Sequence, residues 1–206
     1  MTKSFCHFDT IPSDLMDIIE EDLTEKFDPF MDTSKLMGSQ VHLEKRNSRN
    51  AWIPTSHWLG GLMWYYFNKA NKEFFHYDLE CIDGESMQYT HYELNQHYDW
   101  HQDEGIASYY KPKASGGRAD ERRVEDFINE KAERVRKLSC SLQLSHEEDY
   151  EGGGTQVLDV DNTMVTLPKG RGSLFFFDSR LAHRAKTVNK GLRKSLICWA
   201  IGPRWK

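Results

Sequence analysis

The sequence predicts a mainly β fold: a double-stranded β-helix, or jelly-roll, core packed against N-terminal helices. Helical periodicity dominates the first third of the chain, and about eight short strand-like runs follow, separated by turn-forming residues. With 206 residues, 38 % of them hydrophobic and 29 % charged, the chain is long enough to bury one core. We therefore expect a single domain over residues 1–206. Residues 1–73 would form a helical support, and residues 74–206 the jelly-roll with an insert at 104–137.

The composition bears on partners and compartment. A net charge of −5 provides no global positive field for nucleic acid or an anionic membrane surface. The first residues lack a basic segment followed by an apolar run, and no window reaches the ~18 apolar residues of a membrane span. Four widely spaced cysteines indicate buried free thiols in a reducing compartment: Cys6, Cys81, Cys140 and Cys198. We expect a cytoplasmic protein with no nucleic-acid or membrane partner; the oligomeric state is left open.

Two helices are expected before the core strands begin. The first spans residues 13–27, with cap chemistry from Ser13 and Asp14. Its apolar stripe consists of Leu15, Ile18, Ile19 and Leu23. The second spans residues 57–72, and we expect its aromatic side chains in the core. The Gly60-Gly61 pair lowers the helix propensity there, which indicates a site of close packing.

The segments around the second helix are predicted as follows. Residues 32–50 are polar, and the charged run at 45–50 is interpreted as a solvated loop rather than a binding patch. Residues 74–81 and 85–92 alternate with a period of two, joined by Asp83-Gly84, which predicts a β-hairpin. In the insert, residues 106–117 are rich in turn formers. Residues 120–136 predict an amphipathic helix with near-balanced charges, covering the barrel.

The remaining strands alternate with glycine-rich or asparagine-containing turns. The predicted strands are residues 97–103, 138–144, 155–160, 164–167, 173–177, 183–187 and 195–201. The predicted turns lie at 151–154, 161–162, 168–172 and 189–191. This succession is typical of a jelly-roll.

The first candidate functional group is a possible metal site. His101 and Asp103 lie two residues apart on a predicted strand, so both side chains point to one face while Gln102 points away. Together they supply two thirds of a two-histidine, one-carboxylate iron site. His183, on a later strand, can complete it. A His-x-Asp triplet alone is a weak signal, because it occurs often by chance.

A candidate carboxylate-binding group follows the third ligand. Arg193 lies ten residues beyond His183, on the next predicted strand, where its guanidinium can form a bidentate pair with a carboxylate. Ser195, two residues on, shares the face of Arg193, and its hydroxyl can donate to the same carboxylate.

In combination these motifs resemble the prolyl-4-hydroxylase-like iron(II)- and 2-oxoglutarate-dependent oxygenases, above all the bacterial and viral subgroup. The resemblance covers roughly residues 89–199. It is carried by Tyr92 with Tyr98-x-x-His101-x-Asp103, by Leu142 to Gly153, by Pro168-Lys-Gly170 before Leu174-Phe-Phe-Phe177, and by His183 to Trp199. It implies Fe(II) ligation by His101, Asp103 and His183. It also implies binding of the distal carboxylate of 2-oxoglutarate by Arg193, with Tyr92 and Gln143 lining the cosubstrate pocket.

The resemblance implies an enzyme that uses Fe(II), 2-oxoglutarate and O2, with ascorbate as a supporting reductant. It would hydroxylate a C–H bond of a prolyl or other residue in a peptide or protein and release succinate and CO2. A free amino acid or small metabolite is an alternative substrate. Nucleic-acid demethylation is a second alternative, opposed by the acidic charge balance and the spacing of Arg193. A non-catalytic metal-binding jelly-roll is a third.

Overall fold

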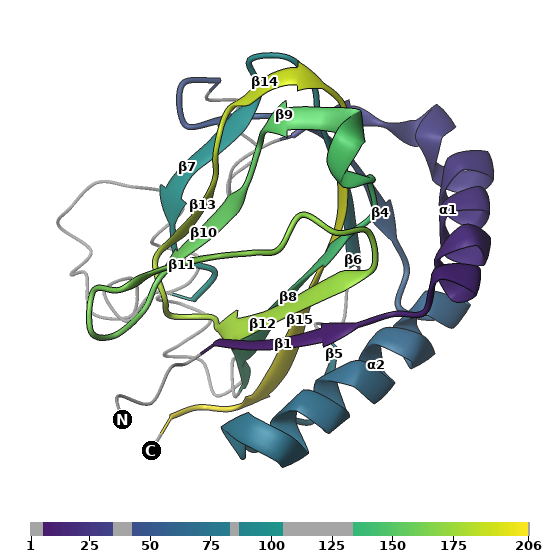
Figure 1. The fold of residues 1–206 in the computed structure, drawn as a ribbon. Coiled ribbons are helices and arrows are strands. Elements are labelled where there is room, and N and C mark those ends of the chain that lie inside the picture. Colours follow the sequence, from purple (N-terminus) through teal and green to yellow (C-terminus); the bar gives the residue numbers. More distant parts are fainter. Residues whose placement is uncertain (1–5, 35–42, 83–86, 105–133, 206) are drawn as a thin grey trace, which may run out of the picture.

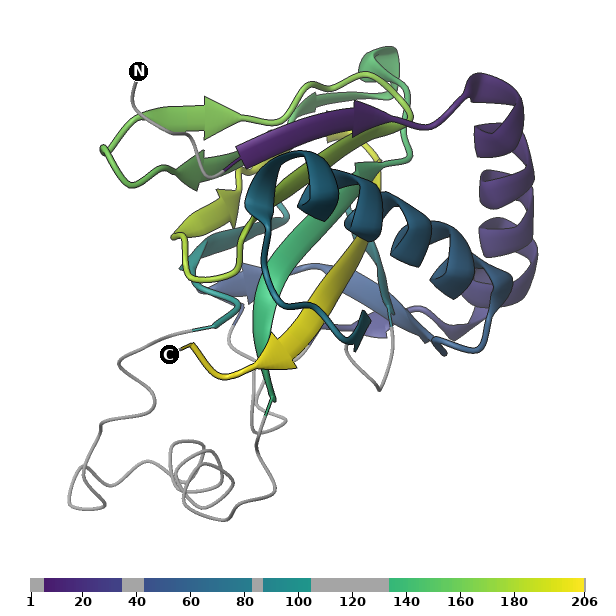
Figure 2. The same ribbon diagram turned by 90° about the horizontal axis from the view of Figure 1, so that it is seen from below.

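Two antiparallel β-sheets face each other across the interior, and two helices cover the outer face of the larger sheet (Figure 1). The computed structural model describes residues 6–34, 43–82, 87–104 and 134–205. Helix α2 (Trp58–Ala70) lies across the larger sheet, and α1 (Ser13–Phe27) stands at the end of this layer (Figure 2). The structure confirms the predicted fold class, a jelly-roll with N-terminal helices.

The strand order of the larger sheet is β1-β12-β8-β15-β6-β4-β2, with β5 beside β15. Its strands are β1 (Cys6–Thr10), β2 (Asp32–Thr33), β4 (Arg49–Ile53), β5 (Cys81–Ile82), β6 (Met87–Tyr92), β8 (Arg134–Gln143), β12 (Ser173–Asp178) and β15 (Arg193–Pro203). The order of the smaller sheet is β11-β10-β13-β7-β3. Its strands are β3 (Arg46–Asn47), β7 (His97–His101), β10 (Thr155–Leu158), β11 (Met164–Thr166) and β13 (His183–Ala185). A separate ribbon pairs β9 (Tyr150–Gly152) with β14 (Val188–Gly191).

Helix α1 has the predicted bounds but not the predicted cap. The residue before it is Pro12, and no side chain caps its first turn. Its buried side chains are Met16, Ile19 and Leu23, whereas Ile18 is exposed. Since a 3.6-residue period places Met16 on the same face as Ile19 and Leu23, the stripe that meets the sheet is rotated away from Ile18.

Helix α2 shows why its two glycines differ. A Cβ added to Gly60 would lie 2.2 Å from the carbonyl oxygen of Thr55, whereas a Cβ on Gly61 would meet nothing within 4 Å. The predicted close packing is therefore confirmed for Gly60 alone. The expectation that the aromatic residues of this helix all enter the core is wrong, because Trp58 and Tyr65 are exposed.

The hairpin predicted over residues 74–92 is also wrong. Residues Asn71–Phe75 continue the helix as a π-helical turn, and only Cys81–Ile82 forms a strand in the first arm. That strand pairs with β15, as does Met87–Tyr92 farther along the same strand. The proposed Asp83-Gly84 turn lies outside the described residues. The alternation of aromatic and polar residues was thus a poor guide, because the packing of Phe75 comes from a helical turn.

The insert ends earlier than predicted. Most of residues 104–137, including the helix expected at 120–136 up to residue 133, lies outside the described residues. Arg134, however, already begins β8 and pairs with Pro203 at the end of β15. The last residues assigned to that helix are therefore strand, because the long β15 provides backbone partners for them. The other predicted core strands are present with bounds shifted by a few residues, while β1, β2, β3, β4, β9 and β14 were not predicted.

The two faces of the larger sheet differ in polarity. Tyr89, Leu196 and Leu142 lie side by side on adjacent strands and pack into the core beneath the helices. One residue along, Thr90, Ser195 and Gln143 also lie side by side, and all three are buried polar residues. Since successive strand residues point to opposite faces, the polar set points into the space between the sheets. The inner face can therefore bind a polar ligand.

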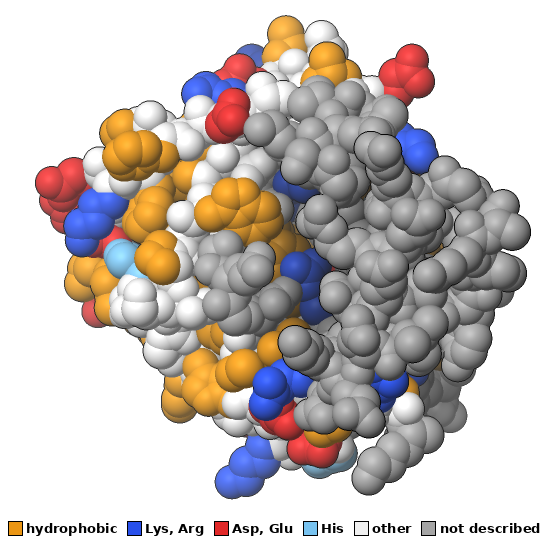
Figure 3. Space-filling view, turned by 180° about the vertical axis from the view of Figure 1, so that it is seen from behind, with side chains coloured by type: hydrophobic (Ala, Val, Ile, Leu, Met, Phe, Trp, Pro, Cys, Tyr) orange, Lys and Arg blue, Asp and Glu red, His pale blue; other side chains and the backbone are white. Residues whose placement is uncertain are grey.

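The last features of the fold are the surface charges, the cysteines and the lengths of the helices. On the face seen in Figure 3, Lys and Arg side chains of the described residues are scattered among acidic and hydrophobic ones. The four cysteines are free; three are buried as expected, but Cys81 is exposed because it lies in the short strand at the sheet edge. Among the described residues, no helix is long and apolar enough to cross a bilayer.

Candidate metal centre and cosubstrate pocket

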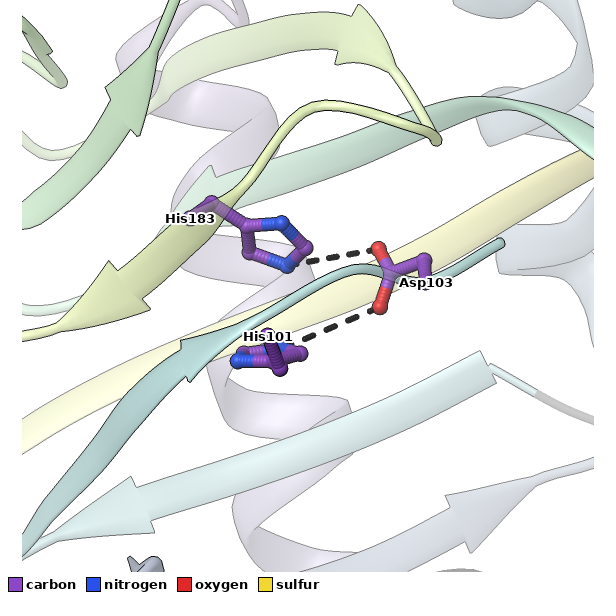
Figure 4. A group of neighbouring side chains, drawn as sticks. All are labelled: His101, Asp103 and His183. Atoms are coloured by element: carbon purple, nitrogen blue, oxygen red, sulfur yellow. Dashed lines mark ion pairs between the residues drawn. The ribbon is translucent and has the colours of Figure 1, made fainter. Parts of the chain in front are cut away.

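His101, Asp103 and His183 converge in the interior (Figure 4). His101 ends β7 and lies directly opposite His183, which begins β13, while Asp103 follows two residues after the end of β7. Their ligand atoms all lie within 4.8 Å of one another. Nε2 of His183 is 3.5 Å from Oδ2 of Asp103, and Nε2 of His101 is 3.9 Å from Oδ1. Two imidazole nitrogens and a carboxylate on one side of a point form the facial arrangement of non-haem iron sites.

Backbone contacts orient both imidazoles. Nδ1 of His101 donates to the carbonyl oxygen of Asp99 at 2.7 Å, and Nδ1 of His183 donates to that of Leu181 at 3.0 Å. Because each Nδ1 carries the proton, Nε2 keeps its lone pair for the centre of the cluster. The local turns thus select the tautomer that a metal requires.

The electrostatics of the cluster also favour a cation. Burial and the neighbouring His183 lower the pKa of His101 to about 3, so its imidazole is neutral at physiological pH. Burial alone would raise the pKa of Asp103, but the two imidazoles lower it well below its usual range. Burial would lower the pKa of His183, yet the Asp103 carboxylate outweighs it and raises that pKa. A buried carboxylate beside two imidazoles is a set of donors that a divalent cation would satisfy.

Ser139, Ser179 and Tyr98 support these side chains; the sequence motif included Tyr98 without giving it a role, and the two serines were not singled out. Oγ of Ser139 on β8 donates to Oδ2 of Asp103 at 2.7 Å and lies 2.8 Å from Oγ of Ser179. The ring of Tyr98 stacks on His101 with centroids 3.5 Å apart. A usable signal for Ser139 was the alternation along β8, where polar residues at 139, 141 and 143 interleave with apolar ones.

Arg46 corrects the interpretation of residues 45–50 as a solvated loop. It begins β3, it is 6 % exposed, and its guanidinium carbon lies 4.7 Å from the centre of the Tyr98 ring. The polar run therefore forms β3, at the edge of the smaller sheet, and the start of β4, which lies between β2 and β6 in the larger one. Nothing in the local sequence indicated that this arginine is buried.

A second polar pocket surrounds Arg193, which is only 1 % exposed. Its Nε donates to Oε1 of Gln143 at 3.2 Å, and its Nη2 donates to Oγ1 of Thr155 at 2.9 Å. Its guanidinium carbon lies 5.5 Å from the centre of the Tyr92 ring. Among the described residues, no carboxylate pairs with it. The structure therefore brings the predicted Arg193, Gln143 and Tyr92 together, and it adds Thr155, which was not predicted.

Ser195 lies beside this pocket. It stands opposite Gln143 on the adjacent strand, it is fully buried, and its Oγ has no hydrogen-bond partner within the described part of the chain. The same holds for Oγ of Ser141. Ser139, Ser141 and Gln143 share one face of β8, so a row of polar groups runs from the His–Asp–His cluster to Arg193. The two candidate sites thus belong to one polar interior.

Comparisons with known proteins agree with this geometry. Residues 87–201 match the family model described as 2OG-Fe(II) oxygenase superfamily. A PKHD-type hydroxylase of Aliarcobacter butzleri (strain RM4018) is 35 % identical over 95 residues, which are 44 % of this chain and 41 % of that protein. The chain thus matches about two fifths of the length of this curated relative.

Solved structures share the fold at low sequence identity. A prolyl-4-hydroxylase of Pseudomonas putida is 14 % identical, with a TM-score of 0.67 over 98 % of this chain and 94 % of that one. A prolyl hydroxylase of Trichoplax adhaerens, solved with a hypoxia inducible factor peptide fragment, is 14 % identical, with a TM-score of 0.70 over 97 % and 84 %. The collagen prolyl hydroxylase of Paramecium Bursaria Chlorella virus-1 is 15 % identical, with a TM-score of 0.61 over 96 % of each chain. On its matched sequence, this chain belongs to the 2OG-Fe(II) oxygenase superfamily, and its fold is that of the prolyl hydroxylases compared above.

Proposed function

We propose that this protein is an iron(II)- and 2-oxoglutarate-dependent dioxygenase that hydroxylates a C–H bond of a prolyl or other residue in a peptide or protein. The observation that carries the proposal is the pairing of a partly buried His–Asp–His cluster with a buried arginine that has no carboxylate partner among the described residues. The first fits a divalent metal and the second fits the far carboxylate of a dicarboxylic acid.

The residues present fit iron(II). His101, Asp103 and His183 would hold it, with both Nε2 atoms already oriented by backbone carbonyls. Three protein ligands on one side leave coordination positions for a 2-oxo acid and for dioxygen. When bound, iron with 2-oxoglutarate and O2 supplies the oxidising power: one oxygen atom enters the new hydroxyl, the other enters succinate, and CO2 leaves.

The pocket around Arg193 fits the rest of the cosubstrate. A guanidinium buried without an anion is costly, and a bidentate carboxylate would offset that cost. Ser195 would donate its free hydroxyl to the same carboxylate, and Gln143 and Thr155 hold the guanidinium in place. Tyr92 would close one side of the pocket and exclude water from it.

A peptide or protein substrate is supported by the neighbour that was solved with a peptide fragment. The net charge of −5 provides no global positive field that would favour nucleic acid. The free thiols, including Cys140 and Cys198 on adjacent strands, support a reducing compartment such as the cytoplasm.

Succinate formation from 2-oxoglutarate, with Fe(II), ascorbate and O2, tests the proposal. Enzymes of this class turn over slowly without their prime substrate, so the target need not be known. We expect turnover in the wild type, none in His183→Ala, and a much higher 2-oxoglutarate requirement in Arg193→Ala. His146→Ala, which removes an exposed histidine, is the matched control. A wild type with neither turnover nor metal-dependent 2-oxoglutarate binding would contradict the proposal and leave a binding module.

A further inference from the structure

Arg46 is a second buried arginine near the metal cluster, and the proposed chemistry does not use it. The only hydrogen bond of its side chain within the described residues is a long one, from Nε to Oγ of Ser48 at 3.3 Å. Nη2 is buried and has no hydrogen-bond partner. A buried guanidinium nitrogen without an acceptor is destabilising. Such groups are rare in native structures, and one that occurs is a candidate for binding a ligand.

Other arginines of the described chain show the contrast. Arg49 pairs with Glu93, Arg134 with Glu80, Arg171 with Asp17 and Glu20, and Arg180 with Asp178. All four are more exposed than Arg46, yet each has a carboxylate partner. Among the described residues, Arg46 and Arg193 are the buried arginines, and neither has a carboxylate partner there. If Arg193 serves the cosubstrate, Arg46 is left for another anion.

The position of Arg46 beside the proposed metal site favours an anionic group of the substrate. β3 lies beside β7, with Arg46 directly opposite Tyr98, and the Tyr98 ring contacts both the guanidinium and the imidazole of His101. Arg46 is thus one aromatic ring away from a proposed metal ligand. It belongs to the smaller sheet, whereas Arg193 belongs to the larger one. A group bound to Arg46 would lie on the side of the cluster formed by Tyr98 and His101.

We propose that Arg46 binds a carboxylate of the substrate on the Tyr98 side of the metal cluster and so makes the enzyme selective for acidic substrates. This inference rests on the proposed function. The free Nη2–H can donate a charge-assisted hydrogen bond to a carboxylate. The contact with the Tyr98 ring holds the guanidinium in a fixed orientation. The carboxylate has two chemical sources: an acidic side chain beside the target residue of a peptide, or the α-carboxylate of a free amino acid.

Matched pairs of probes that differ only in charge test this. The peptide arm uses end-blocked Gly-Asp-Pro-Gly and Gly-Pro-Asp-Gly against the same peptides with Asn in place of Asp. The free arm uses L-proline against L-prolinamide. The measured quantity is kcat/KM for probe-dependent succinate formation, expressed as the ratio of the acidic probe to its amide within each protein. This ratio cancels any general loss of activity in a variant.

In the wild type we expect one acidic probe to exceed its amide by about tenfold or more, as a charge-assisted bond predicts. Arg46→Gln removes the preference, and Arg46→Lys, which keeps the charge but not the planar fork, retains part of it. Arg49→Gln, the same change three residues along, keeps the wild-type ratio. The arm that shows the preference identifies the source of the carboxylate.

Two outcomes overturn the inference. A wild type that forms succinate but prefers no acidic probe contradicts it, as does a preference that survives in Arg46→Gln; both leave the proposed function standing. A wild type that neither forms succinate nor binds 2-oxoglutarate with metal defeats the proposed function, and the inference with it. The wild-type arm needs no variant, so the test stands even where Arg46→Gln does not fold.

Discussion

Ser139 Oγ donates a 2.7 Å hydrogen bond to Oδ2 of Asp103, which joins the larger sheet to the candidate metal cluster on the smaller one. Since Ser139 is fully buried and also contacts Ser179, this bond fixes the plane of the carboxylate. Loss of such an outer partner typically weakens metal affinity about 10- to 100-fold. We therefore expect Ser139→Ala to bind Co(II) or Fe(II) about tenfold more weakly, measured by anaerobic calorimetry.

Ser141→Ala is the matched control for this change. Ser141 lies on the same face of β8, it is equally buried, and its Oγ has no hydrogen-bond partner. We expect it to bind metal as the wild type does. Equal affinity of Ser139→Ala and Ser141→Ala would show that the Ser139 bond does not position the carboxylate.

The role assigned to Arg193 predicts that the protein binds 2-oxo acids with a distal carboxylate more tightly than those without one. 2-Oxobutyrate carries the same metal-binding end as 2-oxoglutarate but lacks the distal carboxylate. We expect the wild type to bind 2-oxoglutarate about 10- to 100-fold more tightly than 2-oxobutyrate, and Arg193→Gln to lose that preference. Arg184→Gln, at an arginine bonded to Gln156 and outside this pocket, controls for a general effect. A preference that persists in Arg193→Gln would refute the assigned role.

The glycine pair of α2 predicts stability changes of opposite sign. Gly60→Ala places a methyl group against the Thr55 backbone, which cannot yield easily, so we expect a loss of about 1–3 kcal/mol in the free energy of unfolding. Gly61→Ala meets open space in a helix, where replacing glycine gains about 0.5–1 kcal/mol. Urea denaturation of both variants and the wild type measures this. Equal effects of the two changes would mean that the Thr55 contact is not limiting.

His91 predicts a loss of stability in mild acid. It is buried against Asp28 and the Tyr89 ring, and burial lowers its pKa to about 4. In the unfolded chain its pKa is near 6.5. As the pH falls from 6.5 to 4, the unfolded state takes up a proton that the folded state does not, so the free energy of unfolding decreases. Between pH 7 and 4.5 the metal-free wild type should lose about 2 kcal/mol more than His91→Gln. Parallel pH profiles of the two proteins would contradict this.

The sequence predicted those parts of the fold that depend on local pattern. The period of 3.6 residues located α1 to the residue, and the turn-forming residues separated most core strands. It also singled out His101, Asp103 and His183, which the structure brings together. Their assignment as metal ligands stays a prediction, as do the roles of Arg193, Tyr92, Ser195 and Gln143.

Features that depend on distant partners were missed. Arg46 looks like part of a solvated run because its sequence neighbours are polar, while its contact with Tyr98, on the adjacent strand, depends on how the sheet is paired. Residues 74–81 alternate like a strand, yet their backbone meets β15 only at the end, where Glu80 bonds to Ile201 and Cys81 begins a two-residue strand. Ser139 carries no motif of its own, and its bond to Asp103 exists only once the two sheets face each other. Pairing between sheets is the information that local periodicity lacks.

The most direct test of the account is the effect of metal on 2-oxoglutarate affinity, measured without oxygen and with Mn(II) in place of Fe(II). If the cluster and the Arg193 pocket form one site, Mn(II) tightens 2-oxoglutarate binding to the wild type by about tenfold or more. The same metal has no effect in Asp103→Ala, whereas Asp161→Ala, at an exposed carboxylate, behaves as the wild type. A wild-type affinity that ignores Mn(II), or an Asp103→Ala variant that responds as the wild type does, would contradict the account.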